Sequence, residues 1–224
     1  MQKAIVFGLC GLLLGLGLGF WGANRLNKDV AEDDPLVGAN IDPATVGLTG
    51  QNPADIQELL DQAAAKPQDF VTQMKTGDLY AQIGRFNEAI EYYKRGVELK
   101  PNDYLANLVL ANAYFDGKQF ENAAKHYAKV LELKDDDLNA RSDYGATFVE
   151  RPEPDLDKAL AEFAKVLEKD PNHTAALYYS AIANHRKDQK DKAFEFLAKL
   201  DGTTADPQLK QRLREILEGK AATQ

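Results

Sequence analysis

Residues that usually carry enzyme chemistry are scarce in this chain of 224 residues. It has one cysteine, one tryptophan and three histidines. The single cysteine, Cys10, excludes an intrachain disulfide and a metal site built from several cysteines. Neither His126 nor His173 has a second metal ligand three or four residues further along, as a helical metal site would require. The sequence therefore predicts no metal site and no cofactor.

Catalytic motifs are lacking as well. There is no glycine-rich phosphate loop and no serine in a G-x-S-x-G turn. Pairs of carboxylates are plentiful, but on amphipathic helices such pairs are typical of solvated faces. An enzyme that uses His185 and Glu150 stays a minor alternative, because no substrate pocket can be argued for these two residues. We expect that the protein is not an enzyme.

Positive charge is in deficit, with 27 Lys and Arg against 35 Asp and Glu and a formal net charge of −8. No basic stripe with interleaved aromatic residues is present, so nucleic acid is not an expected partner. The acidic run Asp135–Asp137 stands just before Leu138, where a helix is expected to begin. Acids in that place are typical of helix capping rather than of a cation site.

A long uncharged stretch lies near the N-terminus. Residues 4–23 contain no charged side chain and as a helix would span about 30 Å, the thickness of the hydrocarbon core of a bilayer. The stretch predicts an uncleaved transmembrane anchor. A cleaved secretory signal is the alternative, although Trp21 stands where a cleavage site needs a small residue. The short tail before the stretch favours a cytoplasmic N-terminus with the rest of the chain outside the cytoplasm, which in a bacterial inner membrane places it in the periplasm.

A row of small residues lies within this anchor, and a polar segment follows it. Gly11, Gly15 and Gly19 stand four apart, a spacing that lets two membrane helices touch and form a homo-oligomer. The alternative is that a leucine-glycine composition produces the row without a function. Residues 24–52 are rich in Gly, Pro, Asp and Asn and predict a flexible linker.

The rest of the chain repeats with a period near 34 residues. Four alanines are spaced by 34, 36 and 34 residues: Ala89, Ala123, Ala159 and Ala193. Each precedes a large side chain by four residues: Tyr93, Tyr127, Phe163 and Leu197. A series of tiny residues keeps the same register: Gly77, Ala111, Gly145 and Ala181. A tiny residue lets two helices approach closely, and the aromatic residue three positions later in the first three repeats, Tyr80, Tyr114 or Phe148, fills the space beside the contact. The shared period predicts an array of helical hairpins.

These series resemble the tetratricopeptide repeat family, whose pattern is a small residue, a tyrosine, an alanine, an aromatic residue four later and a closing proline. The first repeat matches it with Gly77, Tyr80, Ala89, Tyr93 and Pro101, whereas the family's leading tryptophan is absent from every repeat. The resemblance implies an all-α, right-handed solenoid of antiparallel hairpins at residues 53–219, after an N-terminal transmembrane helix at 1–23. We expect a half repeat at 54–67, repeats at about 70–103, 104–137, 138–173 and 174–206, a capping helix at 207–219 and a disordered tail at 220–224.

In this family the first helix of each hairpin lines a concave groove. The register then assigns nine residues to a peptide-binding face: Met74, Asp78, Leu105, Leu108, Asn112, Phe115, Ser142, Tyr178 and His185. The cationic clamp with which some members grip the tail of a chaperone is missing. The mixture of apolar and acidic side chains suits an extended or amphipathic-helical peptide with apolar anchors and basic flanks. The alternative for Leu105, Leu108 and Phe115 is packing against neighbouring helices.

Two functions follow from this layout. The first is a membrane-anchored scaffold or adaptor that binds a peptide or protein segment in its groove, similar in layout to bacterial envelope assembly factors of the cytochrome c biogenesis type. The alternative is a structural subunit that self-assembles within a membrane complex without a binding groove. The sequence does not identify the partner.

Overall fold

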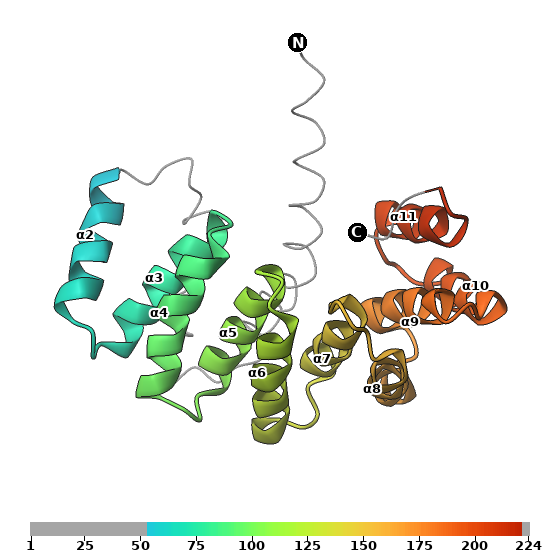
Figure 1. Cartoon of the computed structure of the whole chain (residues 1–224), viewed down its shortest axis with the longest axis horizontal. Helices are drawn as coiled ribbons and strands as arrows, with labels where there is room; N and C mark the ends of the chain where they lie inside the picture. The colour runs from blue at the N-terminus through green and yellow to red at the C-terminus, as the bar shows by residue number, and fades with distance from the viewer. Residues whose placement is uncertain (1–52, 221–224) are drawn as a thin grey trace, which may run out of the picture. The chain divides into compact units, whose positions relative to one another are not determined.

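The structure is a computed structural model that describes residues 53–220, and this part of the chain consists of α-helices and connecting turns (Figure 1). The ten described helices are α2 (Pro53–Ala65), α3 (Phe70–Gln82), α4 (Phe86–Leu99), α5 (Tyr104–Asp116), α6 (Phe120–Leu133), α7 (Leu138–Glu150), α8 (Leu156–Lys169), α9 (Thr174–Arg186), α10 (Lys190–Asp201) and α11 (Pro207–Leu217). The all-α repeat architecture is confirmed. The expected anchor at 4–23 and linker at 24–52 lie outside the described residues. Among the helices of residues 53–220, none combines the length and apolar character that crossing a bilayer requires.

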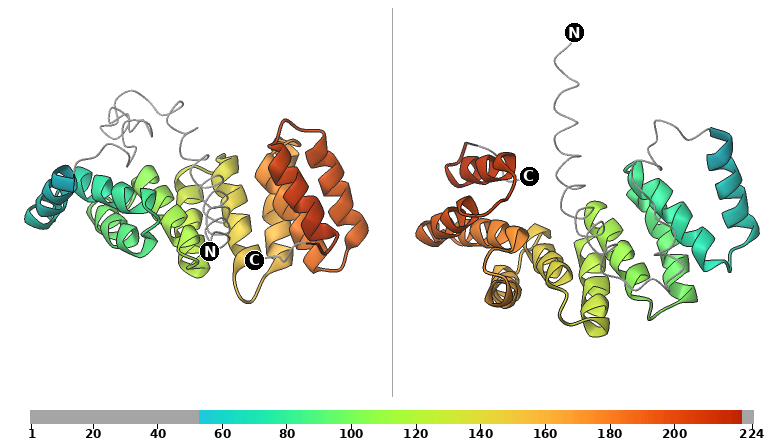
Figure 2. Two further views of the ribbon diagram at one scale, coloured as in Figure 1. Left: turned by 90° about the horizontal axis from the view of Figure 1, so that it is seen from above. Right: turned by 180° about the vertical axis from the view of Figure 1, so that it is seen from behind.

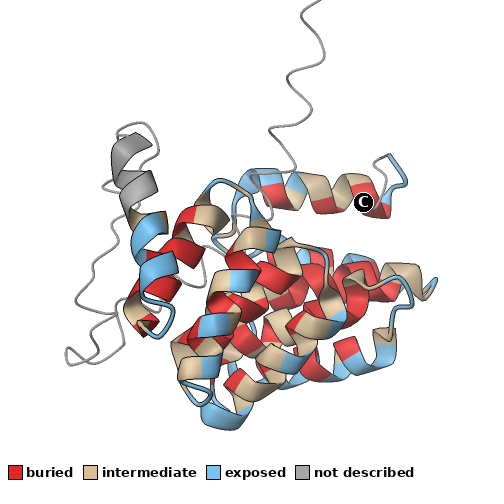
Figure 3. Ribbon diagram, turned by 60° about the vertical axis from the view of Figure 1, so that its left-hand side comes forward, coloured by how far each residue is buried: buried red, intermediate tan, exposed pale blue. Residues whose placement is uncertain are grey.

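The helices fall into two compact units, divided between Gln119 and Phe120. Unit 1 contains α2–α5, in which α4 packs against both α3 and α5 (Figure 1). Unit 2 contains α6–α11, in which α7 pairs with α8, α9 pairs with α10, and α11 covers α9 and α10 (Figure 2). Buried residues gather on the helix faces that meet a neighbour, and exposed residues lie on the outer faces and turns (Figure 3). Each unit is therefore held by the apolar stripes of its own helices.

Gly77 and Gly145 allow close contacts between the two helices of a hairpin. A Cβ atom on Gly77 would lie 2.5 Å from Cδ1 and Cε1 of Tyr93, and one on Gly145 would lie 2.5 Å from Cε1 of Phe163. Both aromatic rings are buried. The missing Cβ thus leaves room for the ring of the second helix.

The first helix of each hairpin begins with a capping side chain. The carboxylates of Asp69, Asp103, Asp137 and Asp206 accept hydrogen bonds from backbone N–H groups in the first turn of α3, α5, α7 and α11. α9 differs, because His173 takes this place and its Nδ1 accepts from the N–H of Ala176 at 3.3 Å. Its Nε2 lies 3.1 Å from Oδ1 of Asn139. A ring with its proton on Nε2 satisfies both contacts, and the second contact ties the start of α9 to α7.

Three of the hairpin turns place one residue in the left-handed region. This residue is Gly84 in the first hairpin, with φ 72°, and Lys118 and Asp188, each with φ 58°, at the corresponding places in the second and fourth. The N–H of the following residue then bonds to a carbonyl of the last helical turn, from Arg85 to Tyr80, from Gln119 to Tyr114 and from Gln189 to Asn184. This geometry satisfies the end of the helix but favours glycine. The sequence supplies glycine at one of the three turns.

We expect Lys118→Gly and Asp188→Gly each to raise the free energy of unfolding by about 0.5–1 kcal/mol. Relief of the left-handed strain, about 1–2 kcal/mol, outweighs the added entropy of glycine in the unfolded chain. Gly84→Ala is the matched control and should lower stability by about 1 kcal/mol, because alanine meets the same strain. Urea unfolding followed by circular dichroism measures all three. A loss of stability in Lys118→Gly comparable to that in Gly84→Ala would contradict the assignment.

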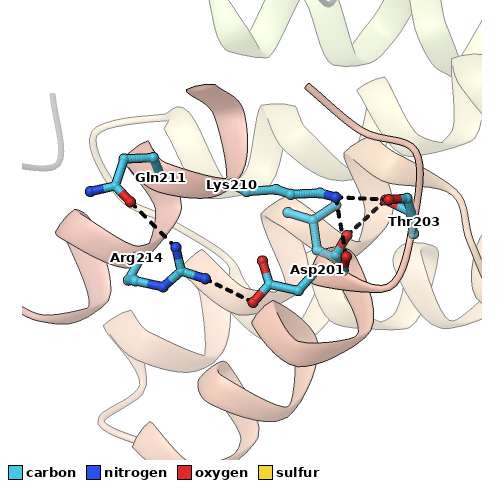
Figure 4. A network of polar contacts seen from close by, with 6 residues as sticks. Asp201, Thr203, Lys210, Gln211 and Arg214 are labelled. Atoms are coloured by element: carbon cyan, nitrogen blue, oxygen red, sulfur yellow. Dashed lines mark hydrogen bonds and ion pairs between the residues drawn. The ribbon is translucent and has the colours of Figure 1, made fainter. Parts of the chain in front are cut away.

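Polar side chains fasten α11 to the end of α10 (Figure 4). Nζ of Lys210 donates to the backbone oxygens of Asp201, at 3.1 Å, and Thr203, at 2.7 Å. The guanidinium of Arg214 pairs with the carboxylate of Asp201 at 2.8 Å and also donates to Gln211. Cations near a helix C-terminus satisfy carbonyls that have no partner within the helix. These contacts orient α11 over the apolar residues that it covers.

A second polar group joins α7 to α8 at the position where the family carries its leading tryptophan. Arg141 stands there, and its guanidinium pairs with Glu162 at 3.0 Å and donates to the backbone oxygen of Asp135 at 2.7 Å. Lys165 also pairs with Glu162, at 2.7 Å. Burial alone would raise the pKa of Glu162, but the hydrogen bonds from Lys165 and Arg141 outweigh it and hold that pKa below its usual value. An ion-pair group thus links the two helices where the family has an indole ring.

Candidate functional site

The first helices of the hairpins carry all nine residues that the sequence assigns to peptide binding, on α3 and α5 in unit 1 and on α7 and α9 in unit 2. Four of them occupy one register position and are core residues in this structure. Their exposed fractions are 2% for Met74, 3% for Leu108, 0% for Ser142 and 7% for Tyr178. Leu108 therefore packs inside the helix stack, which is the alternative considered for it from the sequence. The peptide-binding role of these four stays a prediction, and the proposal below does not depend on them.

Those other five keep part of their surface exposed: Asp78, Leu105, Asn112, Phe115 and His185. Three of them belong to α5, whose sequence YLANLVLANAYFD contains a single charged residue. Its core side carries Leu108 and Leu110, which are buried. Leu105, Asn112 and Phe115 follow at helical spacing and are half-buried. α5 thus has apolar side chains on a partly exposed face as well as in its core, which is typical of a helix that receives a further layer.

Asp78 of α3 faces the second helix of its own hairpin. The hydroxyl of Tyr93 on α4 donates to Oδ1 of Asp78 at 2.6 Å. Burial raises the pKa of Asp78 to about 6, although the hydrogen bond from Tyr93 acts in the opposite direction. Burial also raises the pKa of Tyr93, and the neighbouring carboxylates of Asp78 and Asp116 add to this increase. A carboxylate in such surroundings is costly to keep ionised at neutral pH.

Asp116 is the single charged residue of α5 and the last residue of that helix. Burial raises the pKa of Asp116 to about 7. Within residues 53–220, no hydrogen bond or ion pair of its carboxylate is found. Because the C-terminus of a helix carries partial negative charge, the position also disfavours an anion. Asp78 and Asp116 therefore place two unfavourable acids around Tyr93 in unit 1.

The corresponding acid in unit 2 has a cationic partner. Glu150 ends α7, and Nη2 of Arg186, which ends α9, lies 3.9 Å from its Oε2. Nη1 of Arg186 donates to the backbone oxygen of Val149 at 2.5 Å. Tyr178 lies nearby, and burial raises its pKa, while Arg212 of α11 and Arg186 act against this effect. Glu150 is thus neutralised from within its unit.

His185 lies on α9 one residue before Arg186. Its Nδ1 atom is enclosed, and no hydrogen-bond partner for it is found among the described residues. No group of three His, Cys, Asp or Glu side chains within residues 53–220 is placed to hold a metal ion. The structure therefore brings Asp78 and Asp116 near the same tyrosine, while His185 belongs to the separate polar surroundings of unit 2.

Tyr93 was predicted as a packing residue, and its contact with Asp78 was missed. The signal that could have placed Asp78 near Tyr93 was the shared spacing, because Gly77 and Tyr93 belong to series that keep one register and Asp78 directly follows Gly77. The pairing of Glu150 with Arg186 had a similar signal, since both residues end the first helix of their hairpins. Arg212 could not be placed from the repeat, because α11 follows the last full hairpin.

Comparisons with known proteins agree with this architecture. The family described as "Tetratricopeptide repeat" matches residues 74–137 and 155–209, which is more than half of the chain. No curated protein matches the sequence.

Several solved structures share the fold. A structure titled "Crystal structure of MamA" is 23% identical, has a TM-score of 0.57 and matches over 74% of this chain and 90% of that chain. "MamA 41-end from Desulfovibrio magneticus RS-1" is 20% identical with a TM-score of 0.60, over 67% and 86% of the two chains. A further MamA crystal structure is 19% identical with a TM-score of 0.58, over 94% and 96%. At this identity the likeness shows the fold and not a shared partner.

Proposed function

Because the chain belongs to the tetratricopeptide repeat family, we propose that it is a scaffold that binds a peptide or protein segment along the first helices of its hairpins. The observation that carries this proposal is the surface of α5. Leu105, Val109 and Phe115 are apolar, form a row together with Asn112 at intervals of three or four residues, and keep part of their surface exposed. Apolar side chains in such a row favour a partner that covers them. No assembled catalytic group is found in the described part of the chain, so binding is the function that its residues support.

The proposal has a finer part that concerns the place of binding. We propose that residues 4–23 anchor the chain in a membrane and that residues 24–52 tether the repeats near it. The uncharged length of the first segment supports the anchor. We propose further that the repeats lie in the periplasm of a bacterial envelope. Assembly of envelope proteins is the process in which such a tethered scaffold would act.

Crosslinking in intact cells tests the scaffold. A photoreactive residue at position 112, on the partly exposed face of α5, is expected to give a discrete adduct with another protein. The same residue at position 125, which is exposed on α6, is the control and should not give that adduct. Leu105→Asp should weaken the adduct at position 112, because a charge would face the apolar side chains of the partner. Leu105 is preferred to Leu108, since Leu108 is buried and its replacement would unfold the helix stack.

Self-assembly is the competing outcome of the same experiment. If the adduct at position 112 has twice the mass of the chain and contains only this sequence, the structural alternative holds. Identical adducts from positions 112 and 125 would reject a binding face on α5. Adducts that survive Leu105→Asp unchanged would reject it as well.

A further inference from the structure

The surface of interest consists of Leu105, Val109, Asn112, Phe115 and Asp116 on α5 together with Asp78 on α3, and we call it the unit 1 stripe. The α5 residues follow at intervals of one to four positions and so share one side of the helix. All six residues are half-buried. α3 and α5 carry one cationic side chain between them, Lys75, which is exposed. The stripe is therefore apolar along its length and negative where Asp78 and Asp116 lie.

The charged groups around the two carboxylates come from the helix packed against both α3 and α5. α4 contributes Tyr93, which hydrogen-bonds to Asp78 and is close enough to Asp116 to be affected by its charge. α4 also contributes Glu91 and Lys94, whose charges act on Tyr114 of α5. None of these groups is a cation paired with Asp116. The stripe thus lacks its own counter-charge within the described part of unit 1.

The chain contains its own example of how such an acid is neutralised. The last residues of α3, α5, α7 and α9 occupy one register position and are Gln82, Asp116, Glu150 and Arg186. Two of them are acids. Glu150 has the guanidinium of Arg186 at 3.9 Å, and the same guanidinium donates to a carbonyl at the end of α7. For Asp116 the corresponding residue of the preceding helix is Gln82, which carries no charge.

We propose that the unit 1 stripe binds a partner segment in which an arginine or lysine stands beside an apolar side chain. The cation lies next to Asp116 and Asp78, in the role that Arg186 has beside Glu150. The apolar side chain covers Leu105, Val109 and Phe115. This inference deepens the proposed scaffold function and rests on it, because it names the chemistry of the segment that the scaffold holds.

Binding of a cation is then coupled to the release of protons from the carboxyls of Asp116 and Asp78. Burial raises the pKa of Asp116 to about 7 and that of Asp78 to about 6, so both carboxyls are partly protonated in the free protein near neutral pH. A bound cation stabilises the ionised forms and lowers both pKa values. Affinity for a basic segment is therefore highest near pH 8 and falls as the pH is lowered through about 7 and 6, because protons compete with the cation.

A pair of peptides tests the inference with the full chain in detergent micelles. The first is a short fluorescein-labelled peptide in which leucines alternate with arginines. The second carries citrulline, which has the shape of arginine without its charge, at each arginine position. Fluorescence anisotropy near pH 8 should show about tenfold tighter binding of the arginine peptide, the ratio that a shift of one pKa unit represents. The preference should shrink toward pH 5.5.

Two variants locate the preference. Asp116→Asn should reduce it to less than about twofold, since one of the two carboxylates is lost from the stripe. This variant is expected to fold, because it removes a costly buried charge, and circular dichroism checks that it does. Glu150→Gln is the matched control at the same register position in unit 2. It should leave the preference unchanged, because Glu150 already has Arg186 as its partner.

The outcomes separate the two proposals. Equal binding of both peptides, or an unchanged preference in Asp116→Asn, would overturn the basic-segment inference and leave the scaffold in place. Binding of neither peptide would overturn the inference too, and the crosslinking at position 112 then decides the scaffold independently. If Asp116→Asn instead changes the mass of the free protein in sedimentation, the occupant is a second copy of the chain and the inference is wrong.

Discussion

Phe163→Ala is expected to lower the free energy of unfolding by about 3–5 kcal/mol, the range for removal of a buried aromatic ring. The ring of Phe163 is fully buried and stacks on Tyr179 with 6.1 Å between ring centroids. It also fills the space that Gly145 leaves open. Because α7, α8 and α9 meet at this ring, the cavity cannot close without moving a helix. Urea unfolding followed by far-ultraviolet circular dichroism measures the loss.

A double-mutant cycle shows whether the glycine is the cause of this fit. Gly145→Ala alone should cost about 1–3 kcal/mol by overpacking, partly offset by the better helix propensity of alanine. The fourth hairpin carries Ala181 and Leu197 at the corresponding positions. Gly145→Ala combined with Phe163→Leu should therefore cost less than the sum of the two single changes. Additive costs would show that the ring and the glycine do not constrain each other.

Asp116→Asn is expected to stabilise the protein at and above pH 7, by on the order of 2–4 kcal/mol, since each unit of pKa shift is worth about 1.4 kcal/mol. Burial raises the pKa of Asp116 from 3.8 to about 7. The folded state therefore binds the proton more tightly than the unfolded state does. Stability from this group is highest below pH 4 and is lost as the pH rises from about 4 to 7. The variant removes this dependence.

Thermal unfolding across this pH range measures the effect. The stability gain of Asp116→Asn should vanish well below pH 4, where the carboxyl is protonated in both states. Asp136→Asn provides a control, because Asp136 is exposed and its replacement leaves burial unchanged. The pH dependence that Glu162 contributes to stability has the opposite sign, since its pKa is lowered in the folded state. Its contribution to the free energy of unfolding is lost as the pH falls below the usual pKa of a glutamate. A gain for Asp116→Asn that is the same at every pH would contradict the burial of its charge.

This cost supports a function for Asp116. A residue that lowers stability and has no structural partner in the described chain is the kind of position that activity, rather than folding, explains. The same argument applies to Asp78, although its carboxylate accepts one hydrogen bond, from the hydroxyl of Tyr93. The prediction for Asp116→Asn therefore bears on the unit 1 stripe as well as on stability.

The close packing of the hairpins could be predicted from sequence because it depends on positions whose residues have no side chain beyond Cα or only a methyl group. Gly77 and Gly145 are readable signals, since any side chain there would collide with a ring of the second helix. The departures from the family pattern could also be placed. Arg141 replaces the family's tryptophan, and its ion pair with Glu162 takes over the link between α7 and α8. Such a pair cannot be read from a period, because the other hairpins carry different residue types at these two positions.

The exposed part of the binding face was harder to predict. On a helix packed against neighbours on two sides, residues three or four apart can face either a neighbour or the solvent. Met74 and Asp78 stand four apart on α3, yet Met74 is buried against Gly96 of α4 and Asp78 stays half-buried. Sequence spacing gives the side of the helix but not the depth, which depends on how large the facing residues are. Ser142 shows the same limit, because a small polar residue was assigned to the surface and is enclosed.

The bond between His173 and Asn139 has a consequence for how the array can change. Hairpins of nearly equal length suggest interchangeable units that duplication can add or remove one at a time. Here the cap of α9 depends on a side chain that belongs to the preceding hairpin. Moving either hairpin alone into another protein would leave His173 or Asn139 without its hydrogen-bond partner. We therefore expect these two hairpins to be inherited, lost or grafted together.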